Sequence, residues 1–396
     1  MKILFDNLFI YIQYSIRRTL FMVGEILYMI YPKQLHSDII VFYHMYTMGG
    51  AERVHADILE AISSLNPNLI ICDRSTNDHF FNTYAKFAYE MIDMPALSQN
   101  KFVRNLMFGY ISKMINQHRS KVVLFGSYCS FYYKLLPLLK KDKYIAIDIV
   151  HNLHPGSNAS IELFSLSYVS YLSKRIVINP RVATELKELY FKKNIDIQEL
   201  NKIEIIENGV NIPSSLFKKS KQDFKLIYVG RCSKEKRIDI MGEVAYLCSK
   251  SDFQLKVTFI GIAENCMIEK YRKYCCFTGE IENPIEYYKA AHMIMITSIY
   301  EGFPMAIMEA MSYGVVPIST NVGGIGYHIK DEINGFLVDE EDEKKIALQF
   351  VNKIQYLIKS KKFDMLSSQA YEYSKRNFSK EIFRKKYMKL FTKYLK

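Results

Sequence analysis

The stretch MIMITSIYEGFPMAIMEAMSYG, residues 293–314, decides the fold because a strand, a turn and a helix follow one another in it. The apolar run Met293–Ile296 predicts a short strand buried in a parallel sheet. Pro304 suits the first position of a helix, where its missing N–H would be unpaired anyway. Gly314 suits the left-handed residue that closes the helix. The stretch therefore predicts one strand-turn-helix unit of an α/β protein.

Two acidic side chains, Glu301 and Glu309, belong to this unit, one at the helix start and one two turns inside it. A helix start offers unpaired N–H groups and a partial positive charge, which suit a phosphate group. Carboxylates are poor partners for phosphate, but they accept hydrogen bonds from sugar hydroxyls. The combination predicts a site for a nucleotide sugar.

The same strand-turn-helix pattern recurs from Asp38 to the end of the chain. Short apolar strands that alternate with helices indicate parallel sheets covered on both faces. At 396 residues the chain is long enough for two hydrophobic cores, and a polar stretch divides the pattern into two halves. We therefore expect two Rossmann-like α/β domains in tandem. The expected parts are an N-terminal extension (1–37), a first domain (38–210), a linker (211–223), a second domain (224–375) and a C-terminal helix that packs back on the first domain (376–396).

Composition and motifs exclude several classes of protein. Neither half has a GxGxxG motif after its first strand, which disfavours a dinucleotide oxidoreductase. The 7 cysteines are scattered and form no CxxC pair, so we expect a reducing, cytoplasmic compartment and no structural zinc. There is no Asp-x-Asp motif for a metal-bound diphosphate. We expect no cofactor and no metal.

The formal net charge of +12 is concentrated near the C-terminus. Residues 359–396 contain ten Lys and two Arg against three acidic residues. A solvated helix face, an anionic membrane surface and a nucleic acid are three explanations of this excess. The sequence resembles no nucleic-acid-binding module, so we expect no nucleic-acid partner.

The N-terminal extension is apolar from Ile3 to Tyr31, but charged residues interrupt it. No uncharged stretch reaches the roughly 18 residues that a membrane-spanning helix needs. The pair Arg17 and Arg18 in its middle also argues against a signal peptide. Two alternatives remain: one or two amphipathic helices that lie on the inner membrane face, or a helix packed on the surface of the protein itself.

In each half, a loop that contains glycine follows the first strand. Gly230 opens a loop that holds Arg231 and Lys236, and these two cations suit a nucleoside diphosphate. The alternative is a solvated basic turn. Gly49 and Gly50 allow a close approach of the backbone to a ligand, although ordinary turn chemistry explains them equally well.

A further strand, residues 144–150, ends just before His151 and His154. Either imidazole suits a sugar hydroxyl, and a structural role is the alternative. A metal held by both is a third explanation, but no carboxylate or cysteine is close in sequence.

With these motifs, residues from about 38 to the end resemble the family 4 glycosyltransferases, retaining enzymes of the GT-B fold. The resemblance lies in five motifs that occur in the family's order: Gly49–Val54, Ile205–Val210, Gly230–Arg231 with Lys236, Glu301–Glu309, and Phe378–Glu381. It implies two Rossmann-like domains that face each other across a cleft. The chain departs from the family pattern at Asn152, where an Asp is frequent, and at Asn179, where a Ser is frequent.

The resemblance also implies roles for individual residues. Arg231 and Lys236 would hold the donor diphosphate, and Glu309 would bind the ribose. Glu301 would bind the donor sugar, and His151 would lie by the anomeric centre. The remaining donor contacts would come from the backbone of Gly302, Phe303 and Met305. Gly50 would approach the donor phosphate, or the acceptor, when the domains close.

The motifs and the resemblance together lead us to expect a metal-independent hexosyltransferase that uses a UDP- or GDP-sugar, and the resemblance implies that it is retaining. Its acceptor would be a glycan or a lipid-linked glycan of the cell surface, and an anionic membrane surface is a further candidate partner. Two rivals remain, a sugar-nucleotide epimerase of the same fold and a catalytically silent, membrane-docked subunit of a glycan assembly complex.

Overall fold

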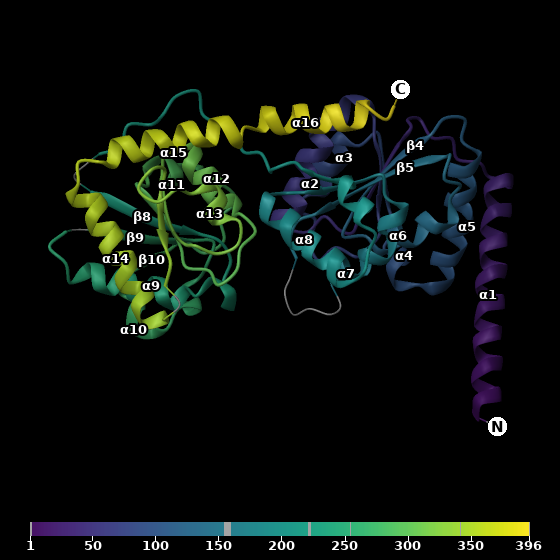
Figure 1. Ribbon diagram of the computed structural model, residues 1–396, viewed down its shortest axis with the longest axis horizontal. Coiled ribbons are helices and arrows are strands. Elements are labelled where there is room, and N and C mark those ends of the chain that lie inside the picture. The colour runs from purple at the N-terminus through teal and green to yellow at the C-terminus, as the bar shows by residue number, and fades with distance from the viewer. Residues whose placement is uncertain (1, 154–159, 221–222, 254, 341, 396) are drawn as a thin grey trace. The chain divides into compact units, whose positions relative to one another are not determined.

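The computed structural model describes residues 2–153, 160–220, 223–253, 255–340 and 342–395. The chain divides into two compact units. The first comprises Met1–Ile178, Val182–Ile206 and Arg384–Lys396, and the second comprises Asn179–Arg181 and Glu207–Phe383. Each unit has its own sheet and core, so the prediction of two α/β domains is confirmed (Figure 1).

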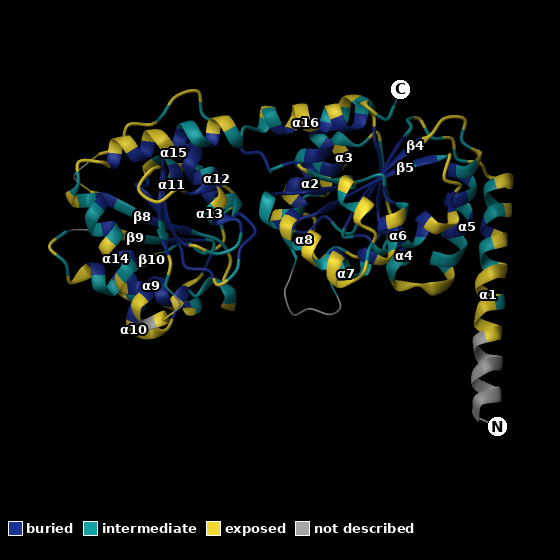
Figure 2. Cartoon of the chain, in the orientation of Figure 1, coloured by how far each residue is buried: buried dark blue, intermediate teal, exposed yellow. Residues whose placement is uncertain are grey.

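The first unit contains a seven-stranded parallel sheet of order β3-β2-β1-β4-β5-β6-β7. Its central strands are buried throughout, because a parallel sheet is covered by helices on both faces (Figure 2). The strands are β1 Ile39–Tyr43, β2 Asn68–Ile71, β3 Glu90–Asp93, β4 Val122–Ser127, β5 Tyr144–Val150, β6 Lys174–Val177 and β7 Ile203–Ile205. The helices are α1 Lys2–Ile30, α2 Gly50–Ile62, α3 Phe81–Phe87, α4 Ala96–Gln99, α5 Lys101–Gln117, α6 Ser130–Leu135, α7 Ile161–Ser165 and α8 Pro180–Lys192.

The second unit contains a six-stranded parallel sheet of order β10-β9-β8-β11-β12-β13. Leu226 and Tyr228 pack into one hydrophobic cluster and Ile227 into another, so alternate residues of one strand face helices on opposite sides. The strands are β8 Phe224–Val229, β9 Leu255–Ile260, β10 Cys276–Phe277, β11 Met293–Ile296, β12 Val316–Thr320 and β13 Phe336–Val338. The helices are α9 Ile238–Ser249, α10 Glu269–Arg272, α11 Ile285–Ala290, α12 Met305–Ser312, α13 Ile325–His328, α14 Glu343–Lys359 and α15 Phe363–Asn377.

The last helix, α16 (Lys380–Thr392), carries the apolar stripe that its sequence spacing indicates. Ser379 accepts a hydrogen bond from the N–H of Glu381 at its start. In the first unit, the rings of Tyr387 and Phe391 are buried and lie 6.4 and 5.6 Å from the ring of Phe125.

The N-terminal extension forms one helix, α1, and its second half packs on α5 within the first unit (Figure 1). A Cβ on Gly24 would lie 1.9 Å from the carbonyl oxygen of Leu106, and one on Gly109 would lie equally close to that of Phe21. The two backbones are therefore in direct contact. Residues 11–14 and 16–19 are exposed, and the helix extends past the rest of the unit there (Figure 2). In the part of the chain that the structure describes, no helix has the length and hydropathy to cross a bilayer.

The turn between β11 and α12 differs from the sequence expectation in one detail. Pro304 has φ −64° and ψ 130°, so it is the extended residue before the helix rather than its first helical residue. Its carbonyl accepts from the N–H groups of Ile307 and Met308, as a residue at the N-cap does. Gly314 has φ +67° and closes the helix in the left-handed conformation, as its position predicts.

Candidate active site

The strand order of the second sheet reverses between β8 and β11. The chain proceeds from β8 outward through β9 to β10, returns to β11, and then proceeds outward in the other direction through β12 to β13. At such a reversal the loops after the two central strands separate and leave a crevice at the carboxyl end of the sheet. Here those loops are the Gly230–Arg237 loop after β8 and the Glu301 turn after β11.

Lys236 and Glu301, one from each loop, are in contact. Lys236 Nζ lies 2.5 Å from Glu301 Oε1, and the hydroxyl of Ser298 donates to the same oxygen at 2.6 Å. The side chains of Lys236 and Glu301 are only 18% and 10% exposed. The pair is thus largely shielded from water, so each charge depends on the other more than in a surface ion pair.

A glycine turn after β12 supports the backbone of the Glu301 turn. Gly323 has φ +61°, and a Cβ there would lie 1.5 Å from the carbonyl oxygen of Glu301. The N–H of Gly324 donates to the carbonyl of Gly302 at 2.6 Å. Only glycine fits at position 323, because both its conformation and its surroundings exclude a side chain.

Arg237 is a further residue of this site, and sequence reasoning missed it. Its guanidinium donates to the carbonyls of Thr297 and Ser298 at 2.6 and 3.2 Å, which ties the loop after β8 to the end of β11. Its own φ of +49° is left-handed. Its position next to Lys236 was a signal, but two adjacent cations in one loop do not show which faces a ligand and which holds the backbone.

Arg231 and Glu309, the other two side chains predicted to contact the donor, lie in the same unit as Lys236 and Glu301. Arg231 is 82% exposed and lies 3.7 Å from Glu235. Glu309, inside α12, accepts a hydrogen bond of 2.8 Å from the hydroxyl of Tyr288 on α11. Arg231 is therefore accessible to an anion, whereas Glu309 is held in place by a tyrosine.

The three backbone N–H groups predicted to contact the donor lie at the start of α12 and just before it. The N–H groups of Gly302, Phe303 and Met305 donate no backbone hydrogen bond to any residue that the structure describes. The Phe303 ring is buried 4.3 Å from the ring of His328 and fixes the turn. The arrangement can receive an anion at the helix start.

The order of the first sheet also reverses, between β1 and β4. The carboxyl ends of β1, β4 and β5 place His44, Ser127 and His151 at one edge. His151 is buried, and its Nε2 lies 3.4 Å from Ser127 Oγ and 3.2 Å from Nε2 of His55 on α2. Burial lowers the pKa of His151 to about 3, so its imidazole is neutral at physiological pH. His154 lies outside the described residues.

The two glycines after β1 differ in their surroundings. A Cβ on Gly49 would lie 2.0 Å from a carboxylate oxygen of Glu52, whereas one on Gly50 would meet nothing within 4 Å. A side chain at position 49 would therefore require the Glu52 carboxylate to move, whereas position 50 has room for one. The space at Gly50, the first residue of α2, is open to a ligand.

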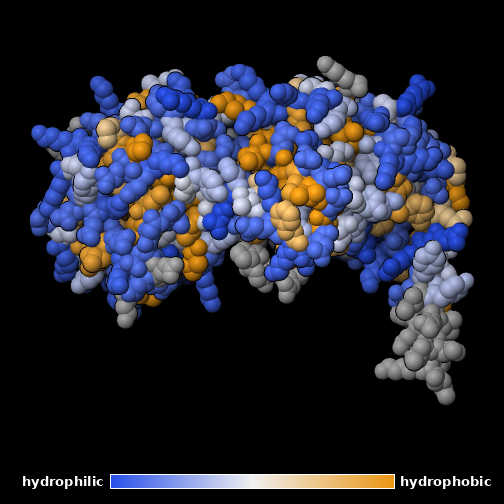
Figure 3. Space-filling model, in the orientation of Figure 1, coloured by the Kyte–Doolittle hydropathy of each residue, from blue (hydrophilic) through white to orange (hydrophobic). Residues whose placement is uncertain are grey.

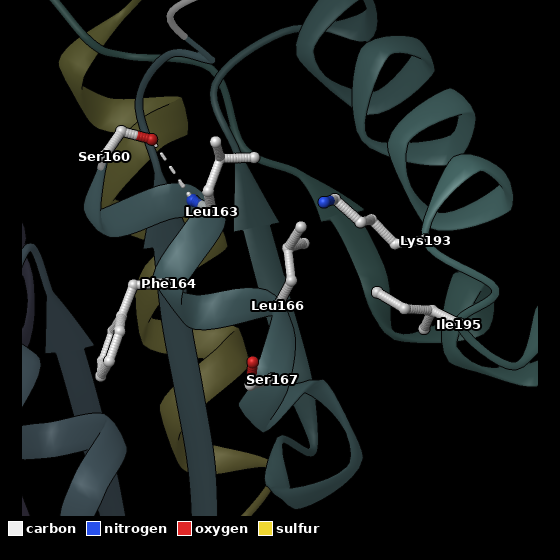
Figure 4. A pocket seen from close by; sticks show the side chains of 7 residues that line it. All are labelled: Ser160, Leu163, Phe164, Leu166, Ser167, Lys193 and Ile195. Atoms are coloured by element: carbon white, nitrogen blue, oxygen red, sulfur yellow. Dashed lines mark hydrogen bonds between the residues drawn. The ribbon is translucent and has the colours of Figure 1, made fainter. Parts of the chain in front are cut away.

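A pocket of about 630 Å³ in the first unit contains none of the predicted residues (Figure 4). Its charged lining residue is Lys193, and the hydroxyl of Ser160 caps the N–H of Leu163. The described residues also contain no group of three or more His, Cys, Asp or Glu side chains that could hold a metal ion.

Comparisons with known proteins agree with this architecture. Residues 214–376 match the family "Glycosyl transferases group 1". The capsular polysaccharide biosynthesis glycosyltransferase CapH of Staphylococcus aureus is 26% identical over 217 residues, which are 52% of this chain and 55% of CapH. The chain thus spans about half the length of this curated relative.

Solved structures show the fold over nearly the whole chain. A glycosyltransferase from Rickettsia africae has a TM-score of 0.69 at 17% identity, with 91% of this chain and 100% of that chain covered. Anabaena Alr3699/HepE in complex with UDP has a TM-score of 0.66 at 15% identity, with 90% and 100% covered. The chain therefore has the α/β fold with two parallel-sheet domains that GT-B glycosyltransferases share, and its second unit matches the group 1 glycosyltransferase family.

Proposed function

We propose that the protein is a retaining glycosyltransferase that moves a hexosyl group from a UDP- or GDP-sugar to a glycan or lipid-linked acceptor in cell-surface polysaccharide synthesis. The observation that carries the proposal is the contact of Lys236 with Glu301 at the reversal point of the second sheet. This is the expected position for the ligand crevice of an open α/β sheet. At this position the second unit brings together the cation Lys236, the carboxylate of Glu301, which we propose binds the sugar, and the start of α12.

In the proposed reaction the bond between C1 of the sugar and the diphosphate oxygen breaks, and negative charge develops on the diphosphate. Arg231, Lys236 and the N–H groups at the start of α12 offset that charge without a metal. The acceptor hydroxyl attacks the same face, and its proton passes to the leaving phosphate. Glu301 binds sugar hydroxyls and Glu309 binds the ribose.

For the first unit we propose that the carboxyl edge of the sheet, with Gly50 and His151, contacts the sugar or its acceptor. The names of the relatives support the substrate class. CapH is named for capsular polysaccharide biosynthesis, and HepE was solved with UDP.

A panel of nucleotides tests the proposal. UDP or GDP, with the matching sugar nucleotides, should raise the melting temperature of the full chain, whereas NAD should not. With a UDP-sugar, slow release of the free sugar by hydrolysis is expected, and its first-formed anomer should have the configuration of the donor. An epimerised nucleotide would favour the epimerase. Nucleotide binding without any turnover, in the presence of lipid-linked glycans, would favour the silent subunit.

We also propose that the exposed half of α1 lies on an anionic membrane surface. Tyr11, Ile12, Tyr14 and Ile16 are between 44% and 69% exposed, and Arg17 and Arg18 are exposed beside them. Exposed aromatic and aliphatic residues next to cations are typical of a helix in the membrane interface. Apolar side chains also gather where the end of α1 joins the unit (Figure 3).

The contact of α1 with α5 makes point variants a better test than removal of residues 1–36, which would uncover α5. The full chain should float with phosphatidylglycerol vesicles and not with phosphatidylcholine vesicles. Because each basic residue near the surface contributes about 1 kcal/mol, the double variant Arg17→Glu/Arg18→Glu should lose at least about tenfold in binding. The matched control Lys140→Glu/Lys141→Glu changes the same charge at another exposed site of this unit. Equal flotation of both double variants would contradict the proposal.

A further inference from the structure

Three polar side chains meet in the first unit at the carboxyl edge of the sheet. His55 Nε2 lies 2.7 Å from Ser127 Oγ and 3.2 Å from His151 Nε2, and Ser127 Oγ lies 3.4 Å from His151 Nε2. His55 comes from α2, Ser127 ends β4, and His151 follows β5. His55 and Ser127 are 0% exposed, so bulk solvent does not reach these two side chains.

The contact limits where the protons can be. Two Nε2–H groups facing each other at 3.2 Å would repel, so only one of the two imidazoles carries its proton on Nε2. Ser127 has one hydroxyl proton, which satisfies the nitrogen that has none. Each arrangement therefore assigns opposite tautomers to His55 and His151.

The other ring nitrogen of His55 decides between the two arrangements. Nδ1 of His55 is buried and has no hydrogen-bond partner among the described residues. Orphaned buried N–H groups are rarer in proteins than under-satisfied acceptors, so Nδ1 of His55 is the bare nitrogen. His55 then carries its proton on Nε2 and donates to Ser127, and the Ser127 hydroxyl donates to Nε2 of His151.

We propose that His55 and Ser127 are positioning residues that fix His151 as the neutral tautomer with its proton on Nδ1. That N–H is then available as a hydrogen-bond donor to an oxygen of the sugar ligand. The ring of Tyr128 stacks on His151 at 5.4 Å and 7° and fixes the plane in which the N–H points. Tyr128 has φ +52°, a conformation that is costly outside glycine and keeps the ring at this place.

The lowered pKa values of the histidines agree with this arrangement. Burial lowers the pKa of His55, and His151 and His44 lower it further. Neither His55 nor His151 therefore takes a second proton near pH 7. A second proton on either ring would place two N–H groups against each other. The proposal rests on the proposed function only for the oxygen that accepts the Nδ1–H, since the tautomer itself exists without substrate.

The tautomer can be measured directly in the full chain. Long-range proton–nitrogen NMR correlations of 15N-histidine-labelled protein should show His151 protonated on Nδ1 and bare on Nε2, with a His151→Gln variant to assign the signal. In His55→Phe and in the double variant Ser127→Ala/His55→Phe, the form of His151 with its proton on Nε2 should appear, whereas in Ser127→Ala alone the Nε2–H of His55 can still donate to Nε2 of His151. His55→Gln retains an N–H near the position of Nε2 and should restore the wild-type pattern. His118→Phe is the control, because His118 pairs with Asp38 away from this contact.

Turnover provides the second readout. Hydrolysis of the UDP-sugar found by the nucleotide panel should fall by up to about a hundredfold in kcat in Ser127→Ala/His55→Phe, with KM for the donor nearly unchanged, because a misplaced group acts mainly on the reaction step. His151 protonated on Nε2 in the wild type would overturn the proposal, and so would an unchanged tautomer in both His55→Phe and the double variant. Unchanged hydrolysis of the UDP-sugar by Lys236→Ala would refute the proposed donor site, but it would not alter the result on the His151 tautomer.

Discussion

Replacement of Lys236 by Met separates the structural and the ligand-binding role of this lysine. The substitution keeps most of the aliphatic stem and removes the charge that faces Glu301. Loss of one partner of a buried ion pair costs about 3–5 kcal/mol, because the other charge remains desolvated. Glu301 keeps the hydrogen bond from Ser298, and the pair is 18% and 10% exposed. We therefore expect a loss of about 2–3 kcal/mol in the free energy of unfolding, below the fully buried range.

The same variant should lose nucleotide affinity. A charge-assisted hydrogen bond contributes about 1.5–3 kcal/mol, so UDP should bind about 10–150-fold more weakly to Lys236→Met. The matched variant Glu301→Gln leaves the cation without its carboxylate. It should bind UDP at least as tightly as the wild type, because the diphosphate no longer competes with Glu301 for Lys236.

Urea unfolding and titration calorimetry with UDP check both parts. The double variant Lys236→Met/Glu301→Gln contains neither charge, so it should regain at least about 1 kcal/mol relative to the sum of the single losses. Unaltered UDP affinity in Lys236→Met, together with lost stability, would show that the lysine only holds Glu301. That result would refute the assigned diphosphate contact.

Three further substitutions or conditions test the structure. Glu309→Ala should lower turnover at least about tenfold, since a hydrogen bond to a charged group is worth about 1.5–3 kcal/mol. It should also lower the melting temperature, because the buried hydroxyl of Tyr288 loses this acceptor. Gly323→Ala should unfold at much lower urea than Gly279→Ala, because both have positive φ but only position 323 lacks space for a Cβ; equal midpoints would contradict the packing of this turn. Burial lowers the pKa of His44 to about 4 and that of His151 to about 3, so below their unfolded value near 6.5 the unfolded chain takes up protons first. From pH 7.5 to 5.5 each should cost about 1.4 kcal/mol of stability, and His44→Gln should reduce this loss in urea titrations at the two pH values.

Much of the fold can be predicted from the sequence because its strands are continuous apolar runs between polar turns. The bounds predicted for β5 and β11 agree with the structure to the residue. Such strands are buried on both faces, so a continuous apolar run is enough to identify them, without hydrophobic alternation and without knowing which strand pairs with which. The N-terminal extension could not be assigned in this way, and the sequence left two alternatives for it. Half of α1 packs on α5, and this contact depends on Gly109, which is remote in sequence.

The sequence did not show which charged residues pair with one another. Arg175 is buried and donates to Asp148 and Ser165, although its place in β6 gave no sign of a partner. Burial of an arginine is tolerated because its N–H groups are satisfied by side chains from other elements. The same limit applied to Lys236, whose contact with Glu301 joins residues 65 positions apart.

Arg231 and Lys236, the two cations of the Gly230–Arg237 loop that we assign to the donor diphosphate, have different environments and therefore different roles in the proposed reaction. Arg231 is exposed to solvent and is accessible to a diphosphate before any contact is broken. Lys236 is shielded and paired with Glu301, so a phosphate that binds it competes with that carboxylate. An exposed charge acts mainly on the rate of association, whereas a desolvated one acts mainly on the rate of release. In the proposed reaction, a phosphate bound to Lys236 weakens its contact with Glu301, and the carboxylate becomes a better acceptor for the sugar hydroxyls in the occupied site.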